Sequence, residues 1–376
     1  MDSCEVLIVG GGPAGSSCAW ELRRSGLDTI ILDKQVFPRD KICGGWITPA
    51  VLDALEIDRN KYASSRILQS ITGFRTSCMG EREVETMYGE TISYGIRRFE
   101  FDDYLLRRSR ARVYEGVALA SLERASDHWV VNGQIKARVI VGAGGHFCPV
   151  ARFLGADARK EVAVVAQETE FELTPPQLAN CSIQGEVPEL YFCPDMKGYG
   201  WCFRKRNFLN IGMGRLDAHA LPQHVSGFMQ FLKCSRKLGA EVATSLRGHA
   251  YLLYRYHQRD VVGDAILLVG DSAGLAYSQS GEGIRPAVES GLLAADVIIS
   301  ARGEYNQRTL SPYSSALTSQ FGKVQDDWSV VIGRRIPARL ISSFSKLLLE
   351  SRWFSRHVIL DHWFLHRDDL ALRHSG

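Results

Sequence analysis

The N-terminal segment holds glycines and an acid whose spacing suits the binding of a dinucleotide. The residues of its Gly-x-Gly-x-x-Gly pattern that we assign to binding are Gly10, Gly12, Pro13, Ala14 and Gly15. Glycines at these spacings permit a tight turn and let a pyrophosphate approach the N–H groups at the start of a helix. Asp33 follows 23 residues after Gly10, where a carboxylate accepts hydrogen bonds from an adenosine ribose. The alternative is a glycine turn that serves only packing.

Apolar runs on both sides of the glycines predict the elements that position them. Residues 6–9 are typical of a buried parallel strand, residues 16–24 of a helix, and residues 29–32 of a second strand that ends at Asp33. Strand, turn, helix, strand and acid together predict a dinucleotide-binding unit. The motif alone does not separate FAD from NAD(P).

Two later apolar runs also end in glycines and predict further strands of the same sheet. They cover residues 139–145 and 265–271, and the second leads through residues 280–284 into a helical run over residues 285–300. Asp271 ends its strand at the edge where open parallel sheets bind ligands. The alternative is that Asp271 and Ser272 only cap a helix. Residues 281–284 predict a helix N-terminus whose N–H groups stabilise an anion.

The set of motifs resembles the geranylgeranyl reductase family of FAD-dependent oxidoreductases, whose superfamily also contains aromatic hydroxylases and flavin-dependent halogenases. The resemblance extends over about residues 5–305, and residues 38–45 and 198–203 carry the signatures of the reductase branch. It implies FAD as the cofactor. The cofactor-binding residues that it implies are Gly10, Gly12, Pro13, Ala14, Gly15, Asp33, Lys34, Lys41, Arg98, Gly270, Asp271, Gly281, Gly283 and Ile284.

Three residues of the branch signatures are the candidates for catalysis. The resemblance places Cys43 beside the flavin, although most unpaired cysteines are small buried hydrophobes. Tyr199 and Trp201 alternate along a predicted strand and therefore share one face of it. We expect this face to wall a pocket for an extended apolar substrate, and ordinary strand core is the alternative.

The chain departs from the family pattern directly after this strand. The family usually has a proline where this sequence has Arg204, which is followed by Lys205 and Arg206. We predict that these three cations lie on the exposed surface. Contact with a phosphate head group is the alternative.

The expected activity is reduction of C=C bonds in an isoprenoid or similarly extended apolar substrate, by hydride transfer from N5 of the reduced flavin. An FAD-dependent monooxygenase of the hydroxylase or halogenase type, using a flavin hydroperoxide, is the alternative. A second, non-enzymatic alternative is a flavin-binding accessory protein or a redox-sensing protein. No second strand-GxGxxG-helix unit follows the first, so we expect no dedicated NAD(P) domain. The external reductant is open between NAD(P)H and a reduced electron carrier, including an electron-donor protein.

Composition argues against several other classes of protein. The 45 basic and 42 acidic residues nearly balance, so we expect no nucleic-acid partner. The nine cysteines form no CxxC pair and the ten histidines no HExxH motif, so we predict no metal site. No export signal and no apolar run of about 18 residues is present. We therefore expect no transmembrane segment and a cytoplasmic location.

These elements predict an α/β fold: a Rossmann-like FAD-binding domain with an inserted antiparallel-sheet substrate domain and a helical C-terminal tail. The predicted boundaries are 1–72, 97–160 and 255–305 for the FAD domain, 73–96 and 161–254 for the substrate domain, and 306–376 for the tail. The tail has apolar residues at helical spacing, namely Leu340, Ile341, Phe344, Leu347 and Leu348. We expect core packing against the FAD domain. The alternative is that the tail contacts a membrane surface, which would be useful for an enzyme whose substrate is carried in lipid. The residues that suggest this contact are Trp328, Trp353 and Trp363 with Arg339, Arg352 and Arg356.

Overall fold

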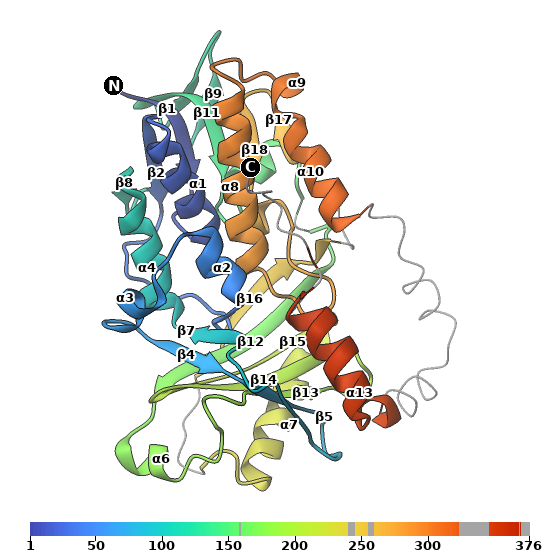
Figure 1. The fold of residues 1–376 in the computed structure, drawn as a ribbon. Coiled ribbons are helices and arrows are strands. Elements are labelled where there is room, and N and C mark those ends of the chain that lie inside the picture. Colours follow the sequence, from blue (N-terminus) through green and yellow to red (C-terminus); the bar gives the residue numbers. More distant parts are fainter. Residues whose placement is uncertain (158, 240–244, 255–258, 323–345, 368, 370–376) are drawn as a thin grey trace.

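The computed structural model describes residues 1–157, 159–239, 245–254, 259–322, 346–367 and 369. Two large sheets lie one above the other, with a small three-stranded sheet beside them (Figure 1). The upper sheet is mainly parallel and the lower mainly antiparallel, and helices follow towards the C-terminus. The predicted α/β fold class is therefore confirmed.

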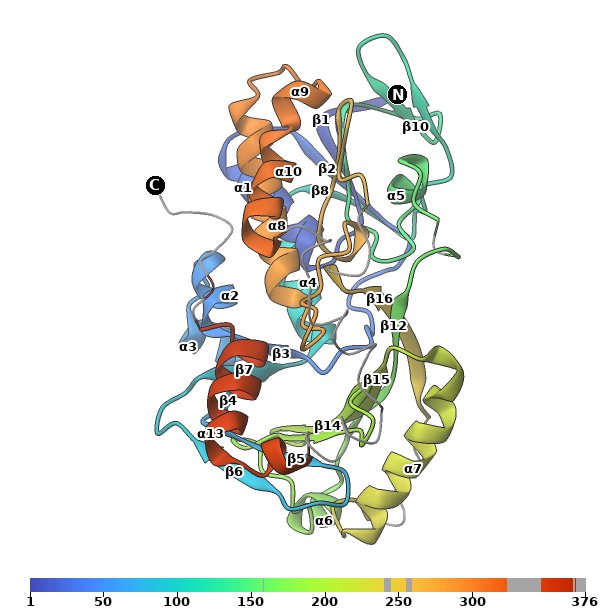
Figure 2. The same ribbon diagram turned by 90° about the vertical axis from the view of Figure 1, so that its right-hand side faces the viewer.

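The upper sheet has a parallel core in the order β18-β11-β1-β2-β8. The apolar runs predicted four of these strands, β1, β2, β11 and β18, but not β8. Its antiparallel edge is β17, and β9 and β10 extend from β11. Helices α1, α8 and α10 cover one face (Figure 2). The strand bounds are β1 Asp2–Val9, β2 Thr29–Asp33, β8 Arg112–Glu115, β9 Leu122–Arg124, β10 Trp129–Val131, β11 Ile135–Gly142, β17 Val262–Gly263 and β18 Ile266–Leu268. The helices are α1 Pro13–Arg24, α8 Ile284–Ser300 and α10 Pro312–Phe321.

The lower sheet has the order β16-β12-β15-β14-β13-β5-β6. It contains four strands that short β-like runs at residues 163–171, 190–193, 200–204 and 208–214 of the sequence predict. One pair, β13 with β5, is parallel, because β5 comes from a distant segment that joins the edge of the antiparallel run. Helix α7 packs on one face (Figure 2), where the ring of Phe228 fills the space beside Gly200. The bounds are β5 Gly73–Cys78, β6 Val84–Met87, β12 Ala163–Glu172, β13 Glu189–Phe192, β14 Gly198–Lys205, β15 Phe208–Arg215, β16 Arg247–Leu252 and α7 Leu221–Cys234.

Shorter elements connect the two large sheets. The small sheet has the order β3-β7-β4 and is antiparallel. Its strands are β3 Trp46–Ile47, β4 Leu68–Ile71 and β7 Ser93–Ile96. The remaining helices are α2 Pro49–Ala54, α3 Arg59–Ala63, α4 Arg98–Ser109, α5 Pro149–Phe153, α6 Pro175–Ala179, α9 Gln307–Leu310 and α13 Arg352–Phe354, with 3-10 turns at Ala218–Ala220 and Gly270–Ser272 and a π-helix at Ser355–Phe364. The domain boundaries themselves stay a prediction.

The C-terminal segment packs into the core, as expected. Ile359, Leu360 and Phe364 are buried in one cluster with apolar residues of the lower and small sheets. The ring of Phe364 contacts Trp46, which lies in the predicted FAD segment 1–72, and also Tyr199 on the lower sheet, so the expected packing against the FAD domain is only part of what this segment does. The predicted helical positions Leu340, Ile341 and Phe344, together with Trp328 and Arg339, lie outside the described residues. Among the described helices, none has the length and apolarity needed to cross a bilayer.

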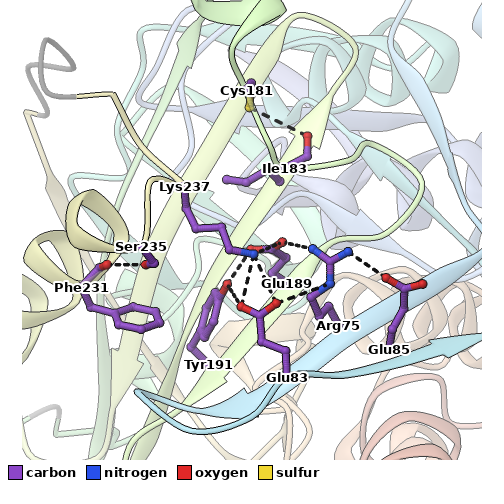
Figure 3. Close-up of polar contacts among 10 residues, drawn as sticks. All are labelled: Arg75, Glu83, Glu85, Cys181, Ile183, Glu189, Tyr191, Phe231, Ser235 and Lys237. Atoms are coloured by element: carbon purple, nitrogen blue, oxygen red, sulfur yellow. Dashed lines mark hydrogen bonds and ion pairs between the residues drawn. The ribbon is translucent and has the colours of Figure 1, made fainter.

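A cluster of charges ties the far edge of the lower sheet to the segment after α7 (Figure 3). Glu189 on β13 is 0% exposed, and its carboxylate accepts hydrogen bonds from Arg75 Nη1 at 2.6 Å and Lys237 Nζ at 2.8 Å. The hydroxyl of Tyr191 donates a third, at 2.6 Å. A buried carboxylate needs such partners, because desolvation of an isolated charge is costly. The cluster therefore serves the stability of the sheet.

Candidate active site

A cavity of about 650 Å³ lies between the carboxyl ends of the parallel strands and the lower sheet. This volume is within the range of small-molecule and cofactor sites. Every predicted site residue lines it except Gly15 and Gly270. The predicted residues in the lining are Gly10, Gly12, Pro13, Ala14, Asp33, Lys34, Lys41, Cys43, Arg98, Tyr199, Trp201, Asp271, Gly281, Gly283 and Ile284.

The glycine turn joins β1 to α1 at one end of the cavity. Gly10 has φ +116°, and a Cβ added there would lie 2.3 Å from the carbonyl oxygen of Ala143. A Cβ on Gly15 would lie 1.9 Å from the carbonyl oxygen of Gly10, so Gly15 permits close packing of helix on strand and does not face the cavity. No side chain caps the N-terminus of α1 at Gly12. Its first N–H groups therefore suit an anionic ligand such as a pyrophosphate.

The carboxylate of Asp33 holds this turn in place. Its Oδ2 accepts a hydrogen bond from Gly11 N at 2.7 Å, and its Oδ1 accepts one from Gln35 N at 2.8 Å. A carboxylate oxygen has more than one lone pair, so Asp33 retains acceptor capacity toward the cavity. The residue thus fits the ribose contact expected of the second strand.

Gly270 also acts through packing. It has φ +58°, and an added Cβ would lie 3.0 Å from the Cβ of Ala14 on α1 and 3.2 Å from that of Ala287 on α8. A side chain there would push both helices outward. The close packing at Gly270 thus places the next residue, Asp271, at the cavity, although Gly270 itself does not line it.

Asp271 belongs to a charged group with Lys41 and a residue that sequence reasoning missed, His249 on β16. Lys41 Nζ lies 3.0 Å from His249 Nε2, which lies 3.8 Å from Asp271 Oδ2. Burial lowers the pKa of Lys41 and of His249. Burial alone would raise the pKa of Asp271, but His249 and Lys41 lower it, so the carboxylate stays charged. A hydroxyl-rich ligand would find a charged acceptor here.

Arg98 at the start of α4 lines the cavity but is already paired. Its Nε and Nη2 donate to the two carboxylate oxygens of Asp102 at 2.6 and 2.8 Å, and Arg39 Nη1 lies 3.0 Å from the same carboxylate. Burial acts to lower the pKa of Arg98, yet the adjacent Asp102 raises it. The guanidinium therefore stays charged beside the loop that carries Lys41.

An aromatic wall, which we define as Tyr199, Trp201, Phe203 and Phe364, covers the side of the cavity formed by the lower sheet. The ring centroids of Tyr199 and Phe364 are 5.4 Å apart, and those of Tyr199 and Trp201 are 6.0 Å apart. The indole Nε1 of Trp201 donates to Asn210 Oδ1 at 2.7 Å, and the Tyr199 hydroxyl donates to the carbonyl oxygen of Ser280. The rings therefore present apolar faces to the cavity while their polar atoms are satisfied.

Phe364 was absent from the predicted site, since nothing in the sequence links a residue near the C-terminus to a strand 160 positions earlier. The three cations after the wall strand are also placed differently from the prediction. Lys205 is 1% exposed, and its Nζ donates to Glu170 Oε2 at 2.7 Å. The prediction of an exposed Lys205 is wrong, because its side chain points inward against Gly45 and Gly95, which leave it room. Arg204 is half-buried, and only Arg206 is exposed.

Two carboxyl groups in the lining were not predicted as site residues. Glu168 on β12 accepts a hydrogen bond at its Oε1 from Cys43 N at 2.5 Å, and Glu282 accepts one at its Oε1 from Arg285 N at 2.7 Å. The Oε2 of each is buried without a hydrogen-bond partner among the described residues. Burial raises the pKa of each to about 7. Glu168 follows Val164 and Ala166 on the same face of β12, and an acidic residue that continues an apolar face is the sequence signal that could have revealed it.

Cys43 lies in the loop between these groups. Its Sγ accepts a hydrogen bond from Gly45 N at 3.4 Å, and its carbonyl oxygen accepts one from Asn210 Nδ2 at 3.3 Å. The residue is half-buried and lines the cavity. These contacts fix the loop against the lower sheet. Among the described residues, no group of three His, Cys, Asp or Glu side chains is placed to hold a metal ion.

Similarity to known proteins agrees with this geometry. Residues 5–83 match the family model described as FAD dependent oxidoreductase. The menaquinone reductase of Mycobacterium tuberculosis is 30% identical over 322 residues, which cover 79% of this chain and 77% of that protein. Digeranylgeranylglycerophospholipid reductase 3 of Methanosphaera stadtmanae is 26% identical over 339 residues, with 85% and 83% covered.

Solved structures share the fold. A geranylgeranyl bacteriochlorophyll reductase-like protein of Thermoplasma acidophilum superposes with a TM-score of 0.78 at 20% identity, covering 98% of both chains. A flavin-dependent brominase superposes with a TM-score of 0.70 at 16% identity, covering 97% of this chain and 92% of its own. Glycine turn, ribose acceptor and cavity fit the cofactor of these proteins. The chain belongs to the geranylgeranyl reductase family and is an FAD-dependent oxidoreductase.

Proposed function

We propose that this enzyme reduces C=C bonds in the isoprenoid chain, or a similarly extended apolar part, of a lipid-like substrate. The observation that carries the proposal is the aromatic wall, which gives the cavity one long apolar side. Two relatives support it by name, since geranylgeranyl and menaquinone both denote molecules with unsaturated isoprenoid chains. When bound and reduced by an external electron donor, FAD would supply the hydride for such a reduction.

The cofactor end of the cavity is proposed to work through backbone and carboxylate groups. The N–H groups at the start of α1 bind the pyrophosphate, and Asp33 accepts hydrogen bonds from the ribose. Asp271 accepts one from a ribityl hydroxyl. Gly281, Gly283 and Ile284 bring the N-terminus of α8 close to the ligand, where its partial positive charge stabilises an anion. Lys34, Lys41 and Arg98 add cations around this end.

The substrate end is proposed to exclude water and to align the apolar chain. Tyr199 and Trp201 hold the chain against the lower sheet, since their rings face the cavity and their polar atoms are satisfied elsewhere. The loop at Cys43 lies between the two ends, and its backbone contacts to Glu168 and Asn210 keep it there. We propose that the predicted FAD domain forms the cofactor end of the cavity, and that the predicted substrate domain and helical tail form the substrate end.

Access of a lipid-borne substrate is proposed to involve peripheral contact with a membrane. Leu347 and Trp353 are 67% and 66% exposed, and Arg352 and Arg356 lie beside them in the chain. Exposed apolar and cationic side chains on one short segment suit an anionic lipid surface. Cosedimentation with anionic and neutral vesicles tests this, with Trp353→Ser as the variant that we expect to bind less.

Anaerobic half-reactions test the proposed function. The purified FAD-loaded enzyme is reduced and then mixed with geranylgeranyl diphosphate or with air while the flavin spectrum is recorded. Reoxidation by the polyprenyl compound, with a product two hydrogens heavier per reduced bond, is the expected result. Reoxidation by air alone would contradict it and would favour the hydroxylase or halogenase type of reaction. Reduction by NADPH, NADH and a reduced ferredoxin, compared in the same cuvette, identifies the donor class.

A further inference from the structure

Reduction of a C=C bond consumes a proton as well as a hydride. General acid catalysis requires a donor within hydrogen-bond reach of the reacting atom and with a pKa near the operating pH. The side chains in the cavity that can donate a proton include those of Cys43, Tyr199, Glu168 and Glu282. They differ in where they lie and in what their protons already contact.

Glu168 lies beside the aromatic wall. An added Cβ on Gly212, the residue facing Trp201 across the β14–β15 pair, would lie 2.2 Å from the Trp201 ring and 2.7 Å from the Cβ of Glu168. Glu168 is 4% exposed, and its Oε1 is fixed by the N–H of Cys43. The second oxygen, Oε2, is buried without a partner among the described residues. A bare carboxylate oxygen in such a place is costly, whereas a protonated one has a donor free for a ligand.

The other three groups suit the role less well. The Tyr199 hydroxyl already donates to the carbonyl oxygen of Ser280, and burial raises its pKa well above the ordinary value. The Cys43 thiol is turned toward Gly45 N. Glu282 lies in the turn that begins α8, on the cofactor side of the cavity, where its Oε1 caps the Arg285 N–H. Glu168 alone of the four combines an unpaired oxygen with a place on the lower sheet.

We infer that Glu168 is the catalytic acid that protonates the carbon of the C=C bond opposite to the one that receives the hydride. The inference rests on the proposed function. In this step the alkene gains two electrons and one hydrogen as hydride from the reduced flavin, and one proton from Glu168 Oε2. The π bond breaks, two C–H bonds form, the flavin is oxidised by two electrons, and Glu168 is left as a carboxylate. Solvent then restores its proton before the next turnover.

The charges around Glu168 allow this cycle. Burial raises its pKa to about 7, while the backbone N–H of Cys43, the cation of Lys205 and the side-chain amide of Asn210 act to lower it and Glu170 acts to raise it. Lys205 and Glu170 are paired with each other at 2.7 Å, so they act on Glu168 in opposite directions. Protonated and ionised forms of Glu168 are therefore both accessible near neutral pH. A catalytic acid that must regain its proton after each turnover requires this.

The test compares the FAD-loaded E168Q, E168D and E172Q variants with the wild type. Glu172 is the matched control, since it lies on the same strand and the same face but is exposed. After anaerobic reduction, we expect reoxidation by geranylgeranyl diphosphate to slow at least about 100-fold in E168Q, with partial rescue in E168D and no change in E172Q. The wild-type rate should fall above pH 7, and E168Q should lose this dependence.

A second readout does not depend on turnover. Infrared spectra of the wild type should contain protonated-carboxyl C=O absorption that titrates near pH 7. E168Q should lose the part that comes from Glu168 and keep the part that comes from Glu282, with FAD content retained. The inference would be overturned if the reoxidation rate of E168Q were within threefold of the wild-type rate with the same pH profile. It would also be overturned if E168Q kept the whole carboxyl absorption. Either outcome would leave the proposed function standing. A wild type inert toward geranylgeranyl diphosphate would overturn both.

Discussion

Replacement of Asp33 by alanine should weaken FAD binding more than any conservative change in the same turn. In the proposed complex the carboxylate accepts hydrogen bonds from the ribose, and in the protein it accepts two from Gly11 N and Gln35 N at 2.7 and 2.8 Å. Loss of an acceptor to a buried donor costs about 1–3 kcal/mol. At about 1.4 kcal/mol per factor of ten, the Kd for FAD should rise roughly 5- to 150-fold.

The D33N variant separates the two contributions. Asparagine keeps one acceptor oxygen for the turn and loses the charge, so we expect a smaller rise in Kd than in D33A. Titration of deflavinated protein with FAD, followed by quenching of flavin fluorescence, measures the Kd. Asp28→Asn is the control, because Asp28 precedes the same strand but is exposed and pairs only with surface arginines. Wild-type Kd in D33A, with a stable apoprotein, would refute the assignment of Asp33 to the ribose.

Three other changes test separate parts of the molecule. Tyr199→Ala should keep FAD bound but lower turnover with a polyprenyl substrate, and an equal loss of flavin would show a structural role instead. Asp271→Ala should raise the Kd for FAD by a similar factor to D33A, measured by the same titration; a variant that purified fully loaded would contradict the ribityl contact. Glu189→Gln should lower the free energy of unfolding by about 3 kcal/mol in urea, because two half-buried cations lose their buried partner, and an unchanged midpoint would contradict this interpretation of the cluster.

The nucleotide-binding half of the fold could be predicted because its determinants are local. The glycine turn needs Gly10 at φ +116° and Gly15 against the Gly10 carbonyl oxygen, and no other residue meets both conditions without moving backbone atoms. Strand, turn and helix are consecutive, so periodicity and composition place them. The same local logic placed β12 to β15 within one or two residues of their observed ends.

The substrate end could not be predicted in the same way, because its residues meet only through tertiary packing. Phe364 and Tyr199 are distant in sequence, and the contact depends on how the C-terminal segment folds back over the lower sheet. Lys205 lies between Arg204 and Arg206 in a cationic run that suggests a surface, yet two glycines on neighbouring elements leave space for it in a buried site. Glu168 gains its unusual environment from a loop 125 positions away. Such contacts depend on topology, which a single sequence specifies only indirectly.

The raised pKa of Glu168 carries a further consequence for stability. A carboxyl whose folded pKa of about 7 lies above its unfolded value near 4.3 holds its proton in the folded state while the unfolded chain releases it. Its contribution is therefore fully present below about pH 4 and is lost as the pH rises from there to 7, by up to about 1.4 kcal/mol per pH unit. Over that interval the loss amounts to roughly 3 kcal/mol.

Asp271 acts in the opposite sense, because a carboxylate with a lowered pKa loses stability as the pH falls. The observable is therefore the difference between variants. Urea unfolding of apoprotein at pH 5.0 and pH 7.5 should show that E168Q gains about 2.5 kcal/mol relative to the wild type on going to the higher pH. E282Q should gain a similar amount, since burial raises the pKa of Glu282 to the same value, and the exposed control E172Q should gain nothing. A constant difference between E168Q and wild type at both pH values would mean that Glu168 is ionised at neutral pH, which would remove its proton from the reaction as well.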